Sequence, residues 1–443
     1  MNPTFLTISM LLTVGTLQAQ NQPAQLPDDL RALVQQANTN YPVLKQQQQQ
    51  IQASEVRVDI ARTAMKPNVS GNASYQYLNP VAKATLPIDG VDRTLQFAPN
   101  HNLNAYFGVG QTIYDWGRTN AAVKQAGDNV QVLRRNLEIT QQSLAYQVAA
   151  AYYGVGFLQK SLSVQDSVIR TAGANVRLLV TRLQNGDALQ YDVLSQQVRV
   201  KIAQNRKIEI QNQLERQLAT LTYLTGNPNP DISKALDQFN LEAMSGRVVT
   251  QPFNLANDTQ SLLGNKDVQL AQDRVRQAET DILVSNLSGR PSLSFTGSAG
   301  FRNGYLPDIN TPKFNVAAGV VLAVPIYAGK RYQLQNQNAQ LTLNANRYAV
   351  ENANAQVRQS IAQLNADIRS NQTRLVNLET QVEQAQKALQ IANARLRNGV
   401  ITNVELQSAE TGVEEAELGR LNFQYQLMLN QLELKRLLGE SLL

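Results

Sequence analysis

Apolar residues of helical period dominate two long stretches of the chain. The first runs from Gly117 to Gly186 without a proline, and the second ends at Gly399. In the second stretch, apolar residues recur in steps of three and four or their sums, which is the spacing of coiled-coil packing. We therefore expect two long helices, at about 118–185 and 330–398. Each would be about 100 Å long, far longer than the helices of ordinary globular domains.

The pattern changes to a period of two ahead of each long helix. Polar and apolar residues alternate over about 68–78, 103–114, 292–301 and 313–324, and such lengths can cross a bilayer when the strands are tilted. A half-buried hairpin of a soluble protein gives the same alternation. Four strands cannot close a barrel within one chain, so a membrane location requires several chains to share one barrel. The connection through Pro80, Pro87 and Pro99 is expected to be a loop.

The two halves of the chain are tandem repeats. Tyr327 lies 213 residues after Tyr114, and Gly399 lies 213 residues after Gly186. Two marks that share one offset indicate a duplication. After each Asn-Gly turn a return helix should pack antiparallel to its long helix, giving two helical hairpins. The expected segments are a signal peptide at 1–20, a first repeat at 21–226 with its return helix at about 187–225, an inter-repeat equatorial linker at 227–253, and a second repeat at 254–443 with its return helix at about 402–439.

Composition removes several function classes. The 443 residues include no Cys and one His, which excludes disulfides, a thiolate nucleophile and Cys-ligated zinc. The net charge of +6 is not concentrated in a basic run, so nucleic acid is a poor partner. No constellation of residues suggests catalysis, a cofactor or a metal. No run of 18 or more apolar residues predicts a transmembrane helix.

The hairpin ends resemble those of a known family. Arg182-x-x-x-Gly186 followed by Asp192-Val193-Leu194, and Arg395-x-x-x-Gly399 followed by Glu405-Leu406, are similar to the two tip motifs of TolC-type outer-membrane efflux proteins. The twice-repeated order of helix, strand hairpin, long helix and return helix resembles the same family over essentially the whole mature chain. The resemblance implies an α+β membrane protein whose three copies share a twelve-stranded transmembrane β-barrel in the outer membrane, continued by an α-helical barrel across the periplasm.

The same resemblance implies an exit duct of a tripartite efflux or type I secretion system. Such a duct docks on a periplasmic adaptor protein and on an inner-membrane pump of the RND or ABC type, and contacts outer-membrane lipid. The residues expected at the docking tip are Arg182, Gly186, Asp192, Val193, Leu194, Arg395, Gly399 and Leu406.

Glu405 and Asp192 are candidate gate residues. Three copies of Glu405 would surround one axis, where close carboxylates repel one another unless they are hydrated or bridged by cations. The alternative for both acids is a local role, because an acid in the first turn stabilises its own helix through the dipole. Likewise, Gly186 and Gly399 are explained as helix terminators, and Arg182 and Arg395 as cations at helix ends.

Tyr114, Trp116 and Tyr327 lie where strand gives way to long helix. They are expected either to anchor the protein at a membrane interface or to pack at the strand-to-helix junction. Two rivals to the duct remain open from the residues. One is a coiled-coil periplasmic or surface scaffold without channel activity. The other, a self-sufficient porin, is disfavoured because a porin has no use for such helices.

Overall fold

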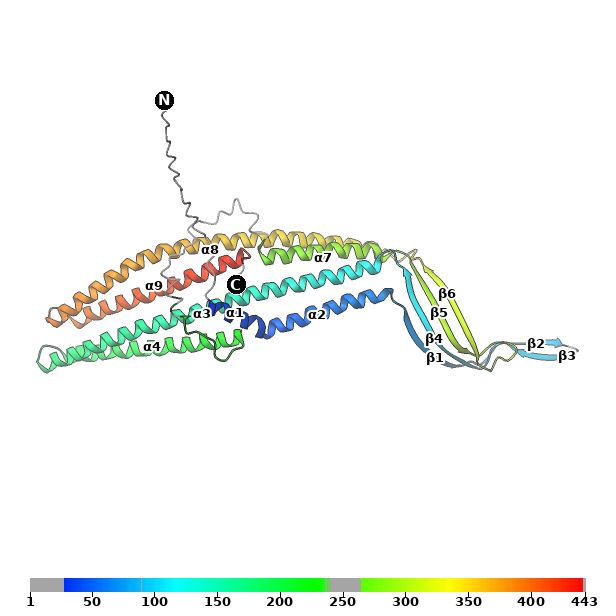
Figure 1. The fold of residues 1–443 in the computed structure, drawn as a ribbon, viewed down its shortest axis with the longest axis horizontal. Helices are drawn as coiled ribbons and strands as arrows, with labels where there is room; N and C mark the ends of the chain where they lie inside the picture. The colour runs from blue at the N-terminus through cyan, green and yellow to red at the C-terminus, as the bar shows by residue number, and fades with distance from the viewer. Residues whose placement is uncertain (1–27, 89, 236, 238, 240–263, 441–443) are drawn as a thin grey trace, which may run out of the picture.

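The protein forms a long, narrow molecule with helices at one end and strands at the other (Figure 1). The structure is a computed structural model that describes residues 28–88, 90–235, 237, 239 and 264–440. The expected signal peptide and most of the expected linker lie outside these residues. None of the helices described is both long enough and apolar enough to cross a membrane.

Each half of the chain is built on one long helix flanked by two shorter helices placed end to end (Figure 1). In the first half α2 and α4 flank α3, and in the second half α7 and α9 flank α8. The bounds are α1 Asp28–Asn40, α2 Pro42–Arg62, α3 Arg118–Gln184, α4 Gln190–Thr225, α7 Lys266–Ser288, α8 Arg331–Arg397 and α9 Asn403–Leu437. The return helix α4 begins three residues later than expected, because the turn after Gly186 continues to Leu189.

Both long helices end in the same backbone motif. After α3, the amide of Asp187 donates to Arg182 O at 2.8 Å and the amide of Gly186 donates to Leu183 O at 3.0 Å. This pair of bonds is the Schellman motif, which needs a left-handed residue at its turn. Gly186 has φ 89° and Gly399, which closes α8 with the corresponding bonds, has φ 73°. The two glycines are therefore helix terminators.

The starts of the long helices repeat a second feature. Two consecutive residues with positive φ precede α3, Trp116 and Gly117, and two precede α8, Gly329 and Lys330. The residue pairs are 213 positions apart, although the glycine is second in one pair and first in the other. The duplicated backbone path has thus been kept while the glycine moved by one residue.

The strands form one four-stranded antiparallel sheet in the order β1-β4-β5-β6. The bounds are β1 Asn68–Tyr77, β4 His101–Tyr114, β5 Ser292–Arg302 and β6 Lys313–Ala323. The two hairpins pair through their inner strands, so each half of the chain contributes two adjacent strands. The sheet leaves β1 and β6 as its two edges, which have no partner within the described chain.

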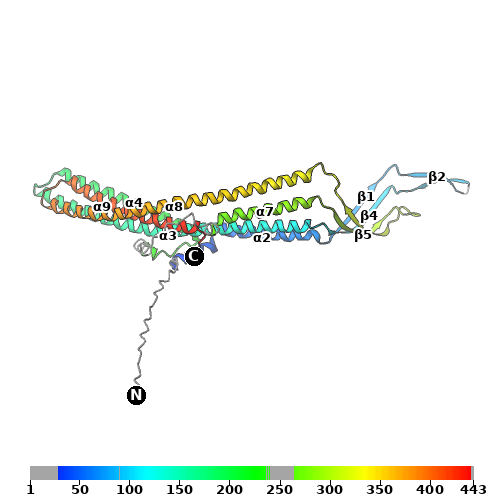
Figure 2. The same ribbon diagram turned by 90° about the horizontal axis from the view of Figure 1, so that it is seen from above.

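The segment between the first two strands of the sheet is not the loop that the sequence predicted. That segment contains a second hairpin of two strands, β2 (Lys83–Ile88) and β3 (Val91–Gln96), which projects beyond the sheet (Figures 1 and 2). Pro87 lies within β2 opposite Asp92. Proline is tolerated there because both strands of a two-stranded hairpin are edge strands.

The main apolar core lies at the middle of the helical body. Residues of α1, α3, α4 and α9 meet there around Tyr152 and Tyr153, which are almost fully buried. A second, smaller cluster lies between α7, α8 and the end of α9. A third lies at the hairpin tips around Leu179, Val193 and Leu406. The apolar residues expected to form the coiled-coil seams of α3 and α8 are all buried or half-buried.

Candidate functional site

The four-stranded sheet has one face that is apolar across its middle rows. In an antiparallel sheet the residues paired across neighbouring strands point to the same side. One such row contains Gly71, Phe107, Ala299 and Val316, and the next contains Ala73, Ala105, Phe301 and Phe314. No helix covers this face, since Phe107 is 71% exposed and Val316 is 67% exposed. A sheet that exposes a continuous apolar face in a single chain needs lipid or protein against it.

The opposite face of the sheet is polar and borders an open groove. The groove has a volume of about 840 Å³ and is lined mainly by Asn, Ser, Thr and Gly, including Ser70, Asn72, Asn104, Ser298 and Asn315. Polar on one face and apolar on the other is the pattern of a strand that separates water from lipid.

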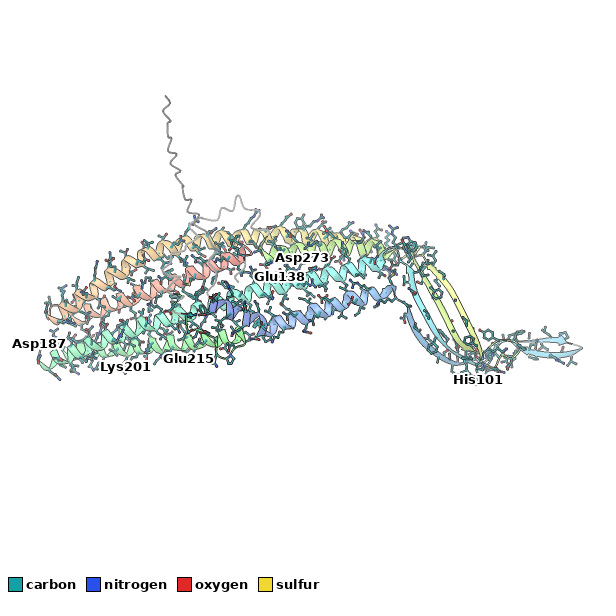
Figure 3. The ribbon with its side chains drawn as sticks, in the orientation of Figure 1. His101, Glu138, Asp187, Lys201, Glu215 and Asp273 are labelled. Carbon is teal, nitrogen blue, oxygen red and sulfur yellow. The ribbon has the colours of Figure 1, made fainter. Side chains whose placement is uncertain are left out.

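Aromatic side chains gather at both ends of the apolar face. At the far end, the Tyr75 hydroxyl lies 2.7 Å from His101 Nδ1, and the His101 ring lies 5.2 Å from the Tyr77 ring. Figure 3 marks this end of the sheet with His101. At the end near the helices, Tyr114 and Trp116 make an edge-to-face contact at 4.7 Å. Aromatic girdles at two levels are typical of membrane-spanning strands.

Tyr114 and Trp116 therefore pack against each other at the strand-to-helix junction while keeping outward surface. Tyr114 is 53% exposed and Trp116 is 38% exposed. Tyr327, at the equivalent place in the second half, is 85% exposed. The contact and the exposure fit both roles expected for these residues, and their interfacial role remains a prediction.

At the opposite end of the molecule, marked by Asp187 in Figure 3, Arg182 joins the two hairpin tips. Its Nη1 donates to Leu396 O of α8 at 2.8 Å, and its Nη2 donates to Asp187 O of its own turn at 2.9 Å. The guanidinium also lies against Gly399, where an added Cβ would approach Nη2 to 3.0 Å. Arg182 thus ties the first tip to the second, whereas Arg395 remains exposed.

The other predicted docking residues divide by burial. Val193 and Leu406 belong to the apolar core of the tip, with 4% and 0% exposure. They hold α4 and α9 in place and offer no surface to another protein. Leu194 is 51% exposed and does offer a surface. Sequence reasoning missed further exposed apolar residues at the two tips, namely Leu189, Tyr191, Val400 and Val404.

Both gate candidates cap the helices that carry them. The Glu405 carboxylate accepts the Thr402 amide at 2.8 Å and the Thr402 hydroxyl at 3.0 Å. These bonds, with a smaller contribution from the positive charge of Arg395, lower the pKa of Glu405. The Asp192 carboxylate similarly accepts the Leu189 amide at 3.2 Å. The structure places both carboxylates at the tip, and the local role expected for each is present.

A buried polar cluster that sequence reasoning missed lies behind the tips, between the two hairpins. Arg199 of α4 donates to Glu414 of α9 at 2.6 Å, and both side chains are almost fully buried. Arg206 donates to the other Glu414 oxygen at 3.1 Å. Nearby, Glu410 accepts the Asn175 side chain at 2.6 Å and the Gln196 side chain at 3.1 Å. We call these six residues the inter-hairpin network.

Exposed apolar residues also follow the two lateral sides of the helical body. On α8, Leu334, Leu341 and Tyr348 are exposed at seven-residue intervals. Val56 and Ile60 are exposed on α2, which lies on the other side of the body (Figure 1). A heptad-spaced apolar stripe is a helix-packing surface. The α8 stripe is therefore a helix surface without a partner in the described chain, and the pair on α2 adds exposed apolar area on the other side of the body.

The described residues offer no metal centre. Within them, no group of three or more His, Cys, Asp or Glu side chains is placed to hold an ion. The single His, His101, lies on the sheet between tyrosine rings. What the arrangement supports is a boundary between lipid and water at the sheet, with exposed hairpin tips at the opposite end of the molecule (Figure 3).

Comparisons with known proteins agree with this geometry. The model of the outer membrane efflux protein family matches residues 33–227 and 259–440. The outer membrane protein TolC of Escherichia coli is 25% identical over 93% of this chain and 82% of TolC. The fold matches the outer membrane protein VceC of Vibrio cholerae, with a TM-score of 0.73 at 17% identity over 94% of this chain and 97% of VceC. It also matches the outer membrane channel CmeC of Campylobacter jejuni, with a TM-score of 0.73 at 16% identity over 99% of this chain and 93% of CmeC.

Proposed function

We propose, from the premise that this chain belongs to the outer membrane efflux protein family, that three copies close into a single duct. The protein resides in the outer membrane and serves as an exit duct of an efflux system. Its family is one of channels rather than enzymes. The observation that carries the trimer is the two-faced sheet with two unpaired edges.

The open edges of the sheet require other chains. Unpaired backbone amides and carbonyls are not tolerated in lipid, so strands that span a membrane close into a barrel. Four strands are too few, because eight is the practical minimum. Three copies supply twelve strands, with each β6 pairing with the β1 of the next copy. The apolar rows then face lipid and the polar groove becomes part of the lumen.

The helical body supports the same closure. The exposed stripe of α8 lies on the β6 side of the molecule, and the exposed residues of α2 lie on the β1 side (Figure 1). A contact between these two unlike surfaces is head-to-tail, and such contacts close into rings when the rotation allows. The rotation that relates neighbouring copies would therefore pair β6 with the next β1 and the α8 surface with the next α2 surface. The result would be an α-helical barrel that continues the β-barrel.

The hairpin tips form the periplasmic end of this duct. The exposed residues Leu189, Tyr191, Leu194, Val400 and Val404 are the surface that we propose for docking a periplasmic adaptor, with an inner-membrane pump of the RND or ABC type behind it. Glu405 would contribute to the gate. The inter-hairpin network holds the two hairpins of a chain together just behind the tips. Opening the duct by moving the hairpin tips apart therefore requires this network to be rearranged.

Engineered disulfides test the shared barrel directly. The natural chain has no cysteine. Within one chain β1 and β6 are separated by two strands, which places them about 14 Å apart. A disulfide requires Cα atoms within about 7 Å, so a β1–β6 disulfide must join two chains. We would pair Ser70→Cys with Asn315→Cys, Ala317→Cys or Gly319→Cys in turn.

We expect at least one pair to give a covalent trimer on a denaturing gel after oxidation in outer-membrane fractions. The pair Ser70→Cys with Ser298→Cys, which adds a cysteine in the inner strand β5, is the matched control and should stay monomeric. Monomers with every edge pair, or a ladder extending beyond three chains, would contradict the closed trimer. The mass of the detergent-extracted protein, corrected for bound detergent, gives an independent count of the chains.

A further inference from the structure

The polar face of the sheet carries all its formal charge in one row. Among the described residues of the four strands, the charged side chains are Arg302 and Lys313, and neither Asp nor Glu occurs. The two cations are register partners across β5 and β6, and Arg302 also pairs with Asn104, which pairs with Ser74. The row Ser74–Asn104–Arg302–Lys313 therefore crosses the whole sheet near the end that bears His101.

This row is unfavourable for the fold when taken by itself. Like charges directly opposite each other on neighbouring strands destabilise a sheet. Within the described residues Arg302 makes no ion pair, and the guanidinium borders the polar groove. The carboxylate of Asp308, in the β5–β6 connection, is bonded to Thr311 and Asn310, and these bonds, with a weaker effect of Lys313, lower its pKa. Asp308 offsets part of the charge of Lys313 and leaves that of Arg302.

The rest of the groove is suited to a solute that carries negative charge. The next row inward, Asn72, Tyr106, Gly300 and Asn315, is neutral. Asn315 donates from its amide to the Tyr305 hydroxyl, so the β5–β6 connection folds against the polar face beside the cations. Hydrogen-bond donors of the groove thus lie near Arg302, which lines it, and near the register partner Lys313, with no acid among the described strand residues to compete for the two cations.

We propose that this row is a binding site for organic anions near the outer mouth of the duct, with carboxylate or phosphate groups as the recognised chemistry. This inference rests on the proposed trimer, in which three copies of the row surround the lumen and supply six cations. Arg302 offers a planar, two-pronged donor to such groups and Lys313 a point charge. The level holds an exported anion after it has passed the neutral part of the lumen.

Citrate is the probe for the test. Single-channel current through the purified trimer in a bilayer of phosphatidylcholine is measured at about 0.1 M salt, with citrate on both sides. We expect citrate to reduce the current, and the half-blocking concentration to rise about tenfold in the Arg302→Gln/Lys313→Gln double variant. The Asp308→Asn variant should lower the half-blocking concentration of citrate. The block should weaken at about 1 M salt, where the screening length is near 3 Å.

The matched control is Arg290→Gln, which removes the same charge two residues before the other end of β5. The Arg290→Gln variant should leave the citrate block unchanged. As a control for charge sign, any block by the trivalent cation hexaamminecobalt should be the same in the wild type and in the Arg302→Gln/Lys313→Gln double variant. Equal citrate block in the wild type and the double variant would overturn the anion site.

A second measurement separates this inference from the trimer. Calorimetric titration of the detergent-extracted protein with citrate needs no current. Heat of binding that is lost in the double variant, from a protein that carries no current, would contradict the proposed duct and still support the anion site. A conducting trimer that does not bind citrate would support the duct and contradict the anion site.

Discussion

At the scale of single residues, burial decides which charges matter. Arg199 and Arg206 both donate to Glu414, but the Arg199 side chain is 10% exposed and the Arg206 side chain is 50% exposed. A buried ion pair contributes little net stability, yet removing one partner leaves the other buried and unpaired. An exposed partner is screened by water and is worth about 0–1 kcal/mol. The two arginines therefore form an internal comparison around one carboxylate.

We expect Arg199→Met to destabilise the hairpin ends by up to about 3–5 kcal/mol, because buried Glu410 would lose this cation and buried Glu414 would keep only the exposed Arg206. The matched change Arg206→Met should cost about 1 kcal/mol or less. Hydrogen exchange of α4 and α9 and single-channel current check this. The Arg199 variant should lose protection in both helices and carry more current, and equal effects of the two variants would contradict the burial argument.

Glu405 combines a cap with a candidate gate, and two substitutions separate the two roles. Its folded pKa lies below the usual value of about 4.5. The stabilisation that it gives to α9 is therefore complete above pH 4.5 and is lost as the pH falls through the lower folded pKa. Hydrogen-exchange protection factors in the first turn of α9 should fall over that acidic range. Glu405→Ala should remove the pH dependence.

Glu405→Gln keeps an acceptor for the Thr402 amide and removes the charge. If three Glu405 carboxylates line the closed tip, this variant should reduce the preference for cations over anions in reversal-potential measurements while α9 stays protected. An unchanged preference would leave Glu405 with its capping role alone.

At the scale of elements, the sequence predicted what local chemistry determines. Alternation in the four sheet strands, helical period and the Asn-Gly turns depend on neighbouring residues, and each predicts its element. The β2–β3 hairpin was missed because Pro80, Pro87 and Pro99 argue for a loop. The inter-hairpin network was missed because Arg199 and Glu414 lie 215 residues apart. On their own helices they resemble solvated polar positions, and only the packing of the two repeats buries them.

The two terminating glycines give a prediction at this scale. Gly186→Ala and Gly399→Ala both place a side chain at positive φ, which we expect to cost about 1 kcal/mol each in local stability. An added Cβ at Gly186 meets nothing within 4 Å, whereas at Gly399 it approaches Arg182 Nη2 to 3.0 Å. The Gly399 variant should therefore also weaken the bond from Arg182 to Leu396. Hydrogen exchange at both tips measures the difference, and equal loss of protection would contradict it.

At the scale of the whole molecule, the two faces of the sheet determine where the protein can reside. The adjacent residues Ser298 and Ala299 lie on opposite faces in the middle of β5. An arginine facing the middle of a bilayer costs about 2–4 kcal/mol, whereas one facing an aqueous lumen does not. Ala299→Arg should therefore reduce the amount of protein recovered from outer-membrane fractions, and Ser298→Arg should not. Equal recovery would contradict the assignment of the faces.

The concentration of the core at mid-body has a mechanical consequence. Tyr152 and Tyr153 are fully packed, while roughly thirty residues of α3 extend from there to the tip, an arm of about 45 Å. Over such an arm a tilt of about 5° displaces the end by about 4 Å, because displacement grows with the length of the lever. A rotation too small to break the packing around Tyr152 and Tyr153 would thus produce a larger displacement at the hairpin tip. The tight packing of Tyr152 and Tyr153, deep in the middle of the molecule, therefore limits how far the hairpin tips can move.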